Sequence, residues 1–394
     1  MIPLRTDAVP ATADAVVVGG GVIGLSMAYE LARRGLRRVV LVEAGYLGSG
    51  ATGRCGGGIR QQWTTEANVR LAQESVAIYE QLSAELGYQA FFRQGGYLMI
   101  SEKEADREAL QTAVALQNRC GAPSRFLEPR ECLDIVPQLD ISRIRGATFC
   151  HKDGTAYPFA VVWGYARAAH RRGVQIFIQT RATGFLADEG RVRGVITDRG
   201  TISTPVVVLA ADAWNRSLAA PLGIQLPNWQ ERHEIMVSES VKPCLGPMVI
   251  SITDGIYFSQ SMRGELVGGI GDPDEARVTE PSRFDTRSQL RFAVRFARAL
   301  TAVFPPARSM RLMRQWAGLY DMTPDHRPIL GGVAGLEGYY HMCGFSGHGF
   351  MLAPIAARRM ARLITTGRPD DIIESLLLSR FAGGKVETDR FVVG

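Results

Sequence analysis

Short apolar runs, glycine turns and amphipathic stretches alternate along the chain. Near the N-terminus, residues 14–35 combine a valine run, a glycine turn and an apolar row, Ile23, Met27 and Leu31, that has the spacing of one helix face. A second valine-rich run follows at residues 38–44. This order predicts a strand, a helix and a second strand, which is the opening of a parallel sheet.

The remaining pattern predicts a mixture of helices and a second sheet. Regular short strands between about 230 and 271 favour a mainly antiparallel sheet. Near the C-terminus a helix is expected to begin close to Gly349, because Pro354 is tolerated only in a first helical turn. The other predicted elements are helices over 66–86, 102–120 and 128–136, strands over 92–100 and 206–210, and a meander from residue 173 with turns at 188–190 and 198–200.

Composition limits the classes of protein. The chain has 394 residues and is 46% hydrophobic, which favours more than one domain. The net charge of +6 comes from single arginines spread along helices, so we expect solvated helix faces and no nucleic-acid site. No signal peptide or transmembrane segment is expected, which predicts a cytoplasmic protein.

Cysteine and histidine show no metal-ligand pattern. The six cysteines form no CxxC pair and have no zinc or iron–sulfur spacing, which indicates buried thiols in a reducing compartment. No metal site is therefore predicted, and no chemistry is assigned to His151, His170, His233, His326 and His341.

A dinucleotide fingerprint occupies the first predicted turn. Gly19 permits a tight turn, Gly21 allows a pyrophosphate to approach the backbone, and Gly24 allows close packing of helix and strand. Val22 and Ile23 open the helix, whose N–H groups would face phosphates. Glu43 ends the second strand, followed by Ala44, where a carboxylate can accept both hydroxyls of an adenosine ribose.

Two further glycine-rich segments favour FAD over NAD. The fingerprint alone does not separate the two, because both carry the same ADP half. Residues 49–58 read SGATGRCGGG, and residues 344–354 read GFSGHGFMLAP before an amphipathic run. An FAD that lies extended through the protein needs such separate contacts, and the positive end of the last helix would stabilise a reduced flavin.

Six motifs together resemble the D-amino-acid oxidase and sarcosine oxidase superfamily of FAD amine oxidoreductases. They are GGGVIG, SGATGRCGGGIRQQW, DGTAYPF, VVVLAADAW, WAGLYDMTPDHRPILG and GFSGHGFMLAP. Within the superfamily the likeness is closest to the beta subunit of dye-linked L-proline dehydrogenases and somewhat less close to the beta subunit of sarcosine oxidase. The resemblance implies an α/β and α+β fold, hydride transfer to flavin N5, and further subunits of an alpha or electron-carrier type.

The implied domains are discontinuous. A Rossmann-like FAD-binding domain would comprise 1–90, 151–225 and 310–394, and a substrate domain with a mainly antiparallel sheet would comprise 91–150 and 226–309. The residues expected to bind FAD are the fingerprint residues above together with Ser49, Ala51, Thr52, Arg54, Cys55, Gly57, Gly58, Ala211, Trp214, Gly318, Gly344, Ser346, Gly347, His348, Gly349, Phe350 and Met351.

Several departures from the family pattern change the expectation. Gly318 stands where monomeric sarcosine oxidases carry the cysteine that attaches FAD, so the FAD should be non-covalent. Tyr157 and Pro158 follow the GTA triplet, where the sarcosine oxidase beta subunit has the histidine that holds a second flavin; an FMN at a subunit interface stays a further expectation. Asp212 replaces a frequent glycine, and Asp tolerates a left-handed conformation at modest cost.

Lysine usage favours a dehydrogenase. The four lysines are Lys103, Lys152, Lys242 and Lys385, and none lies in the glycine-rich motifs. Monomeric oxidases of the superfamily have a lysine where Met351 stands here. The resemblance links such a lysine to oxygen reaction or to carboxylate binding, so its absence argues against an oxidase.

Three side chains are candidates for the substrate site. The fork of Arg60 matches a substrate carboxylate, with a structural salt bridge as the alternative. Tyr257 is expected to cover the flavin, although core packing explains an aromatic there equally well. His348 is expected to contact the flavin, and its ring is a candidate proton acceptor.

The sequence therefore predicts dehydrogenation of a secondary or cyclic amino acid, proline-like first and sarcosine-like second. The catalytic subunit of a complex would pass electrons to a second carrier. The alternatives are a self-sufficient oxidase that makes hydrogen peroxide and, from the basic pI alone, a non-catalytic or RNA-associated flavoprotein.

Overall fold

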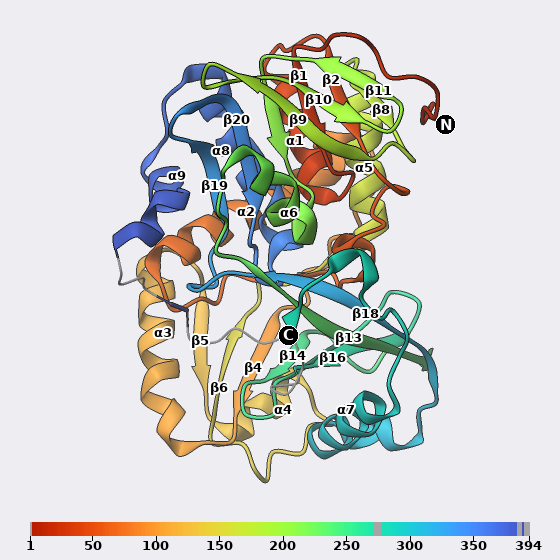
Figure 1. The fold of residues 1–394 in the computed structure, drawn as a ribbon. Coiled ribbons are helices and arrows are strands. Elements are labelled where there is room, and N and C mark those ends of the chain that lie inside the picture. Colours follow the sequence, from red (N-terminus) through yellow and green to blue (C-terminus); the bar gives the residue numbers. More distant parts are fainter. Residues whose placement is uncertain (1, 272–276, 384–387, 390–394) are drawn as a thin grey trace.

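Two large sheets divide the chain between the upper and lower halves of Figure 1. The structure is a computed structural model, and it describes residues 2–271, 277–383 and 388–389. Among these residues no helix is both long and apolar enough to cross a membrane.

The upper sheet has a parallel centre. Its strand order is β11-β10-β20-β12-β1-β2-β8, with β19 beside β20 and β9 beside β10. The valine run of β1 is fully buried and pairs in parallel with β2 and β12, as expected for a strand covered on both faces. The strands are β1 (Ala15–Val18), β2 (Val39–Val42), β8 (Gln175–Phe177), β9 (Ala182–Asp188), β10 (Arg191–Thr197), β11 (Gly200–Ser203), β12 (Val207–Leu209), β19 (Ile329–Val333) and β20 (Leu336–Cys343).

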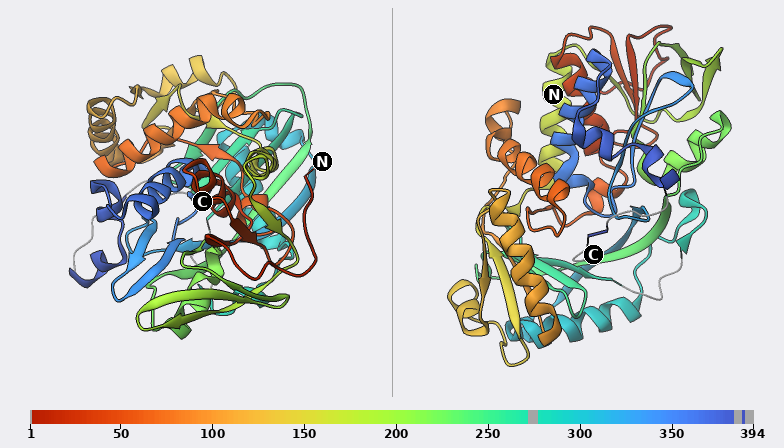
Figure 2. Two further views of the ribbon diagram at one scale, coloured as in Figure 1. Left: turned by 90° about the horizontal axis from the view of Figure 1, so that it is seen from above. Right: turned by 90° about the vertical axis from the view of Figure 1, so that its left-hand side faces the viewer.

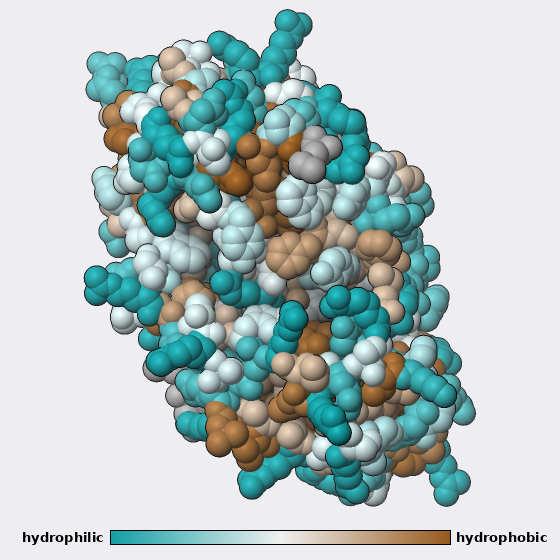
Figure 3. Space-filling view, turned by 90° about the vertical axis from the view of Figure 1, so that its right-hand side faces the viewer, coloured by the Kyte–Doolittle hydropathy of each residue, from teal (hydrophilic) through white to brown (hydrophobic). Residues whose placement is uncertain are grey.

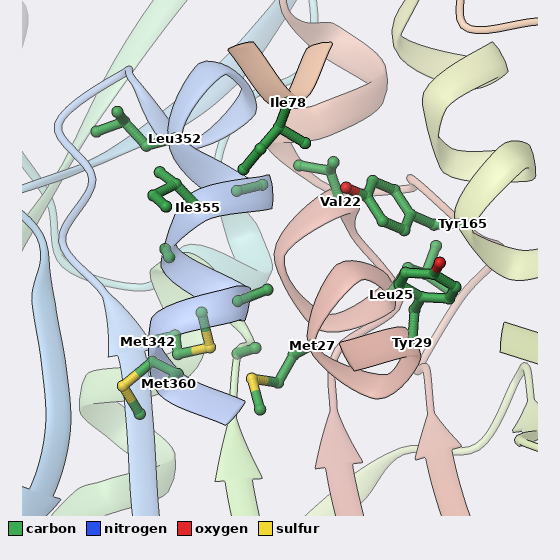
Figure 4. Close-up of a cluster of buried hydrophobic side chains, with 14 of the residues drawn as sticks. Val22, Leu25, Met27, Tyr29, Ile78, Tyr165, Met342, Leu352, Ile355 and Met360 are labelled. Atoms are coloured by element: carbon green, nitrogen blue, oxygen red, sulfur yellow. The ribbon is translucent and has the colours of Figure 1, made fainter. Parts of the chain in front are cut away.

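Three helices contact one face of this sheet, and a fourth packs against two of them. Helix α1 (Val22–Arg33) packs between α5 (Pro158–Arg171) and α8 (Gly349–Thr366), and α2 (Glu66–Leu86) packs against α8. Figure 4 shows the apolar side chains between them, including Met27 of α1, Met360 of α8 and Tyr165 of α5, all buried. Each such side chain contributes about 1.5–3 kcal/mol by leaving water. The packing of α1 against α8 therefore joins an N-terminal segment of the chain to a C-terminal one.

The lower sheet is mainly antiparallel. Its order is β17-β13-β16-β15-β14-β4-β6-β5, with β18 beside β13. Within the described residues, β14 and β4 are its one parallel pair. Helices α3 and α7 flank it in Figure 2. The elements are β4 (Tyr97–Ser101), α3 (Arg107–Arg119), β5 (Ser124–Leu127), α4 (Cys132–Ile135), β6 (Gly146–Cys150), β13 (Trp229–Ser240), β14 (Met248–Ser251), β15 (Ile256–Gln260), β16 (Glu265–Ile270), β17 (Arg277–Val278), α7 (Leu290–Val303) and β18 (Leu312–Met322).

Small elements connect the two halves. A two-stranded sheet joins β3 (Gly58–Ile59) to β7 (Gly154–Thr155), directly before the segment that carries Arg60. The remaining helices are α6 (Asn215–Ala219) and α9 (Asp371–Ser375). Strand β18 begins inside the range assigned to the FAD-binding domain, yet it hydrogen-bonds along β13 of the lower sheet. The domain boundaries themselves stay a prediction.

The secondary-structure predictions are largely confirmed. The helix over 66–86 has the predicted bounds, and helix 102–120 is shortened to α3 after a 3-10 turn. The strand expected over 92–100 is only β4, because Gly96 has a φ of +85° and interrupts it.

The start of α8 is confirmed at Gly349, but the reason given for it is wrong. Pro354 lies inside the helix, beyond its first turn, where it cannot donate to the carbonyl of Phe350. The Tyr79 hydroxyl donates to that carbonyl at 2.6 Å, so a side chain of α2 replaces the missing bond.

Candidate active site

A cavity of about 600 Å³ opens between the two sheets. Its walls come from the turn after β1, the end of β2, the segment after β12, strands β13, β15 and β18, and the turn before α8. Segments that are distant in the sequence therefore meet around one cavity, which residues of both sheets line.

The fingerprint turn forms one end of the cavity. Gly19 has a φ of +118°, and a Cβ on Gly24 would lie 1.9 Å from the Gly19 oxygen, so helix α1 passes too close for any side chain. Glu43 lies beside this turn and accepts the N–H of Gly20 at 2.6 Å and that of Gly45 at 2.7 Å. The turn and the distal acid are therefore in the arrangement of an ADP site.

Two helix N-termini point at the cavity without an anion of their own. Neither α1 nor α8 has an acidic residue in its first turn or a side-chain cap from its N-cap residue, Gly21 and His348 respectively. The Val22 N–H instead donates to the hydroxyl oxygen of Thr52, on the glycine-rich segment, at 3.2 Å. Such helix ends are suited to phosphates and to a reduced flavin.

The glycine-rich segment after β2 follows the cavity wall for only part of its length. Ser49, Ala51, Thr52, Arg54 and Cys55 line the cavity, as does Gly318 on β18 opposite Arg54.

Gly57 and Gly58 are not among the lining residues of this cavity. A Cβ there would lie 2.2 Å from the Ala156 oxygen and 1.8 Å from the Tyr97 hydroxyl, respectively. Packing within the chain thus accounts for these two glycines.

Only part of the turn before α8 lines the cavity, as was the case for the glycine-rich segment. Ser346, Gly347, Gly349 and Phe350 line the cavity, whereas Gly344, His348 and Met351 do not. A Cβ on Gly347 would lie 2.4 Å from the Tyr320 ring, so this glycine lets β18 approach the turn. Of the other residues expected to bind FAD, Val22, Ile23, Ala44, Ala211 and Trp214 line the cavity.

Two buried carboxylates lie beside the segment after β12. Asp212 lines the cavity and has a φ of 51°. This is the left-handed conformation, which an aspartate adopts at modest cost. Burial and the neighbouring Asp321 raise the pKa of Asp212, and burial raises that of Asp321. Asp321 accepts the Gly344 N–H at 2.6 Å and so ties β18 to the turn before α8.

Arg60 belongs to a buried cluster behind the turn before α8. Its guanidinium stacks on Trp63 at 4.1 Å from the ring centre, and Nη1 donates to the Gln62 carbonyl at 2.7 Å. Nη2 lies 3.4 Å from Nε2 of His348, which must be the acceptor because arginine only donates. Arg60 is 2% exposed and is not among the cavity-lining residues.

Burial sets the charge states of this cluster. Burial and the Arg60 charge hold the pKa of His348 well below its usual value, so the imidazole is neutral. Burial also lowers the pKa of Arg60, opposed by the carboxylate charges of Asp389 and Asp153. A guanidinium in this position gains from an incoming anion.

The lower sheet contributes an aromatic wall. Tyr257, on β15, and Tyr320, on β18, both line the cavity, and burial raises the pKa of both phenols. His233 also lines the cavity and stacks on Tyr320 with ring centres 4.0 Å apart. The ring of His233 is buried on this wall, and its Nε2 lies 3.5 Å from the Glu231 carboxylate.

Tyr320 and His233 are site residues that the sequence analysis missed. The pairing of β13 with β18, in which His233 lies opposite Gly318, brings these two residues to the cavity. This strand register cannot be read from the sequence.

Cysteine and metal chemistry have no visible place in the site. Burial raises the pKa of the Cys55 thiol, which lines the cavity, to about 12 and keeps it protonated. In the described part of the chain, no group of three His, Cys, Asp or Glu side chains could hold a metal ion.

A Rossmann-type turn, a distal acid and two uncapped helix ends around one cavity define an oxidoreductase that binds a dinucleotide. The chain belongs to the DAO family of FAD dependent oxidoreductases, whose family model matches residues 14–363. This match confirms the family resemblance, the fold class and the FAD-dependent oxidoreductase activity expected from the sequence.

Known relatives narrow the class to amine and amino acid oxidoreductases. The chain is 33% identical to the beta subunit of sarcosine oxidase from Rhodobacter capsulatus over 359 residues, which is 90% of this chain and 85% of that one. It is 28% identical to human mitochondrial sarcosine dehydrogenase, covering 97% of this chain and 43% of that longer protein. The crystal structure of L-proline dehydrogenase from P. horikoshii matches with a TM-score of 0.90 and 35% identity, covering 96% of this chain and 100% of that one.

Proposed function

We propose that this protein dehydrogenates the C–N bond of a secondary or cyclic amino acid, proline-like first and sarcosine-like second. The observation that carries the proposal is the placement of a buried guanidinium, Arg60, against the turn that closes the FAD cavity. Bound FAD supplies the hydride acceptor, and the neutral amine of the substrate needs no protein base for that transfer.

In this proposal the chain's own residues bind and orient the substrate. Arg60 binds the carboxylate, because an anion that leaves water needs a charge-assisted partner. His348 stays neutral and holds the guanidinium, and Tyr257 contributes a hydroxyl and a ring edge on the opposite wall. Residues of the fingerprint, the glycine-rich segment and the turn before α8 hold FAD non-covalently, since Gly318 offers no thiol for attachment.

A second cavity of about 770 Å³ supports the proposal of a second carrier. It lies beyond the outer halves of β13 and β18, and Tyr157 and Pro158 line it. Cys55 lines both cavities, so a single segment separates them. We propose that an FMN binds there at a subunit interface.

The rim of the second cavity supports the proposal of a partner subunit. Tyr157, Met262 and Met313 line the cavity and are 49%, 57% and 62% exposed. Figure 3 views the molecule from the side on which α5 and the outer end of β13 lie, and apolar side chains appear there among polar ones. Exposed apolar side chains beside a cavity are typical of a surface that another chain covers.

The assignment as a dehydrogenase rests on the cavity lining. Of the described lysines, Lys103, Lys152 and Lys242, none lines either cavity, and Lys385 lies outside the described residues. We propose a cytoplasmic location, because all six cysteines are free thiols, as is usual in a reducing compartment. A peroxide-forming oxidase remains the alternative activity, and rapid reoxidation of the reduced flavin by air would favour it.

Anaerobic titration of the purified flavoprotein tests the proposed function. Absorbance of the flavin is followed while L-proline, hydroxyproline isomers, sarcosine and opines are added one at a time. Bleaching by a proline-like or sarcosine-like amino acid, with dye reduction much faster than oxygen reduction, is the expected result. Equal rates with dye and air would overturn the dehydrogenase assignment, and flavin that no amino acid reduces would overturn the substrate class.

A further inference from the structure

A buried carboxylate lies directly behind the segment that carries Arg60. Asp153 is 0% exposed and ends the turn between β6 and β7. Because β7 pairs with β3, this turn faces the residues that follow β3. A carboxylate is costly to bury without strong hydrogen bonds, so its contacts are informative.

Asp153 holds two consecutive glutamines. Its Oδ1 accepts the backbone N–H of Gln61 at 2.9 Å and the Gln61 side-chain amide at 3.3 Å, and its Oδ2 accepts the Gln62 side-chain amide at 3.0 Å. The backbone of Gly96 donates to the Asp153 carbonyl at 2.9 Å, which fixes the turn itself.

The orientation of the Gln62 amide is fixed from three sides. Its Nε2 donates to Asp153 and to the Tyr97 carbonyl at 3.0 Å, and its Oε1 accepts the Thr148 hydroxyl at 2.6 Å. Turning the amide over would bring its oxygen against two acceptors. The Gln62 carbonyl in turn accepts Nη1 of Arg60.

We infer that Asp153 is a positioning residue for substrate carboxylate binding, which it supports by fixing Gln61 and Gln62 and thereby the carbonyl that orients the Arg60 guanidinium. This inference rests on the proposed function, because Arg60 is the carboxylate-binding group only in that proposal. Asp153 itself does not line the FAD cavity, so it would act on the substrate only through the glutamines and Arg60.

The charge of Asp153 gives the inference a pH signature. Burial raises the pKa of Asp153 to about 6, opposed by the hydrogen bonds from Gln62 and Gln61. Below that pH the carboxyl is protonated and neutral. The added proton then occupies an oxygen that, in the ionised form, accepts a glutamine N–H. Carboxylate binding should therefore weaken as the pH falls from 7.5 to 5.5.

Other groups that face this network do not imitate that signature. Burial raises the pKa values of Tyr97 and Cys150, so both stay neutral, and His348 stays neutral because its pKa is far lower. Arg60 is the facing cation, and Lys152 pairs with Glu80 at 3.1 Å on the surface. Asp389 is the other carboxylate whose charge acts on Arg60.

Binding of cyclopentanecarboxylate, which keeps the ring and carboxylate of proline but has no nitrogen to oxidise, tests the inference. Calorimetric Kd values are compared with those of pyrrolidine, which lacks the carboxylate, on the FAD-loaded protein. Asp153→Asn places an amide donor against the Gln62 donor, and it should weaken the carboxylate ligand about tenfold while leaving pyrrolidine within about twofold. Thr148→Val should act in the same direction and less strongly.

Two further variants separate the outcomes. In an Arg60→Ala background, Asp153→Asn should change the Kd by less than about twofold, because both act through one contact. Asp325→Asn, a control at another fully buried carboxylate that accepts Arg380 at 2.8 Å, should lower thermal stability without changing the ligand Kd.

The possible failures differ for the two proposals. Equal effects of Asp153→Asn and Asp325→Asn on the Kd, additive effects with Arg60→Ala, or an unchanged pH dependence in Asp153→Asn would each overturn the positioning role. Unchanged carboxylate binding by Arg60→Ala would instead overturn the proposed clamp itself.

Discussion

Replacement of Arg60 by alanine should lower kcat/KM for the best amino acid substrate without removing FAD. A charge-assisted hydrogen bond to a carboxylate contributes about 1.5–3 kcal/mol. At about 1.4 kcal/mol per decade, this corresponds to a loss of about tenfold to a hundredfold or somewhat more. FAD content should hold, because the Arg60 side chain contacts Trp63, Gln62 and His348 and does not line the FAD cavity.

Anaerobic flavin reduction in a stopped-flow instrument measures this loss. Arg60→Lys should recover only part of the activity, because a point charge lacks the planar fork. An amine without a carboxylate serves as the matched substrate, and its rate should be nearly the same in the wild type and in Arg60→Ala. Full kcat/KM in Arg60→Ala, or loss of FAD, would show that the arginine supports the fold or the cofactor and does not clamp the substrate.

Three further variants test other parts of the structure. Gly24→Ala should abolish FAD binding, measured as flavin per chain, because its Cβ would lie 1.9 Å from a backbone oxygen. Asp389→Ala should cost about 1–3 kcal/mol, seen as a lower Tm, because it removes the carboxylate that accepts the Thr64 N–H at 2.6 Å and the Thr65 hydroxyl at 2.9 Å just before α2; an unchanged Tm would refute this. Burial raises the pKa values of the interacting pair Asp212 and Asp321 above the ordinary carboxyl range, so the folded apoprotein holds protons that the unfolded chain releases. The stability that this gives is fully present below the ordinary carboxyl pKa and is lost as the pH rises from there through the raised values. Asp212→Asn should flatten this loss in denaturant titrations, and an identical pH profile would contradict it.

Local patterns in the sequence predict the strand, the turn and the helix at one end of the cavity. Gly19 and Glu43 follow rules of strand, turn and helix that act over a few residues, and the structure has them in the predicted places. The same reasoning could not separate a glycine that makes room for a ligand from one that makes room for the chain. Gly57 and Gly58 belong to the second kind, because their neighbours Ala156 and Tyr97 are far away in the sequence.

The substrate end depends on contacts that no local pattern contains. His233 reaches the site only through the register of β13 against β18. Its stacking partner Tyr320 lies on β18, which is next to β13 in the sheet but distant in the sequence. Asp153 and Asp389 contact the segment that carries Arg60, and they come from parts of the chain that lie about 90 and more than 300 residues away. Tertiary packing alone decides such contacts, so they could not be predicted.

The packing of α1 against α8 has a consequence for biosynthesis. The ribosome releases α1 more than three hundred residues before α8, which at roughly 5–20 residues per second is a delay of tens of seconds. During that time the buried face of α1, including Leu25, Met27 and Leu31, has no partner from α8, and the FAD cavity lacks one of its walls. A complete FAD cavity therefore forms only after nearly the whole chain has been made, because α8 and the turn before it supply part of its lining.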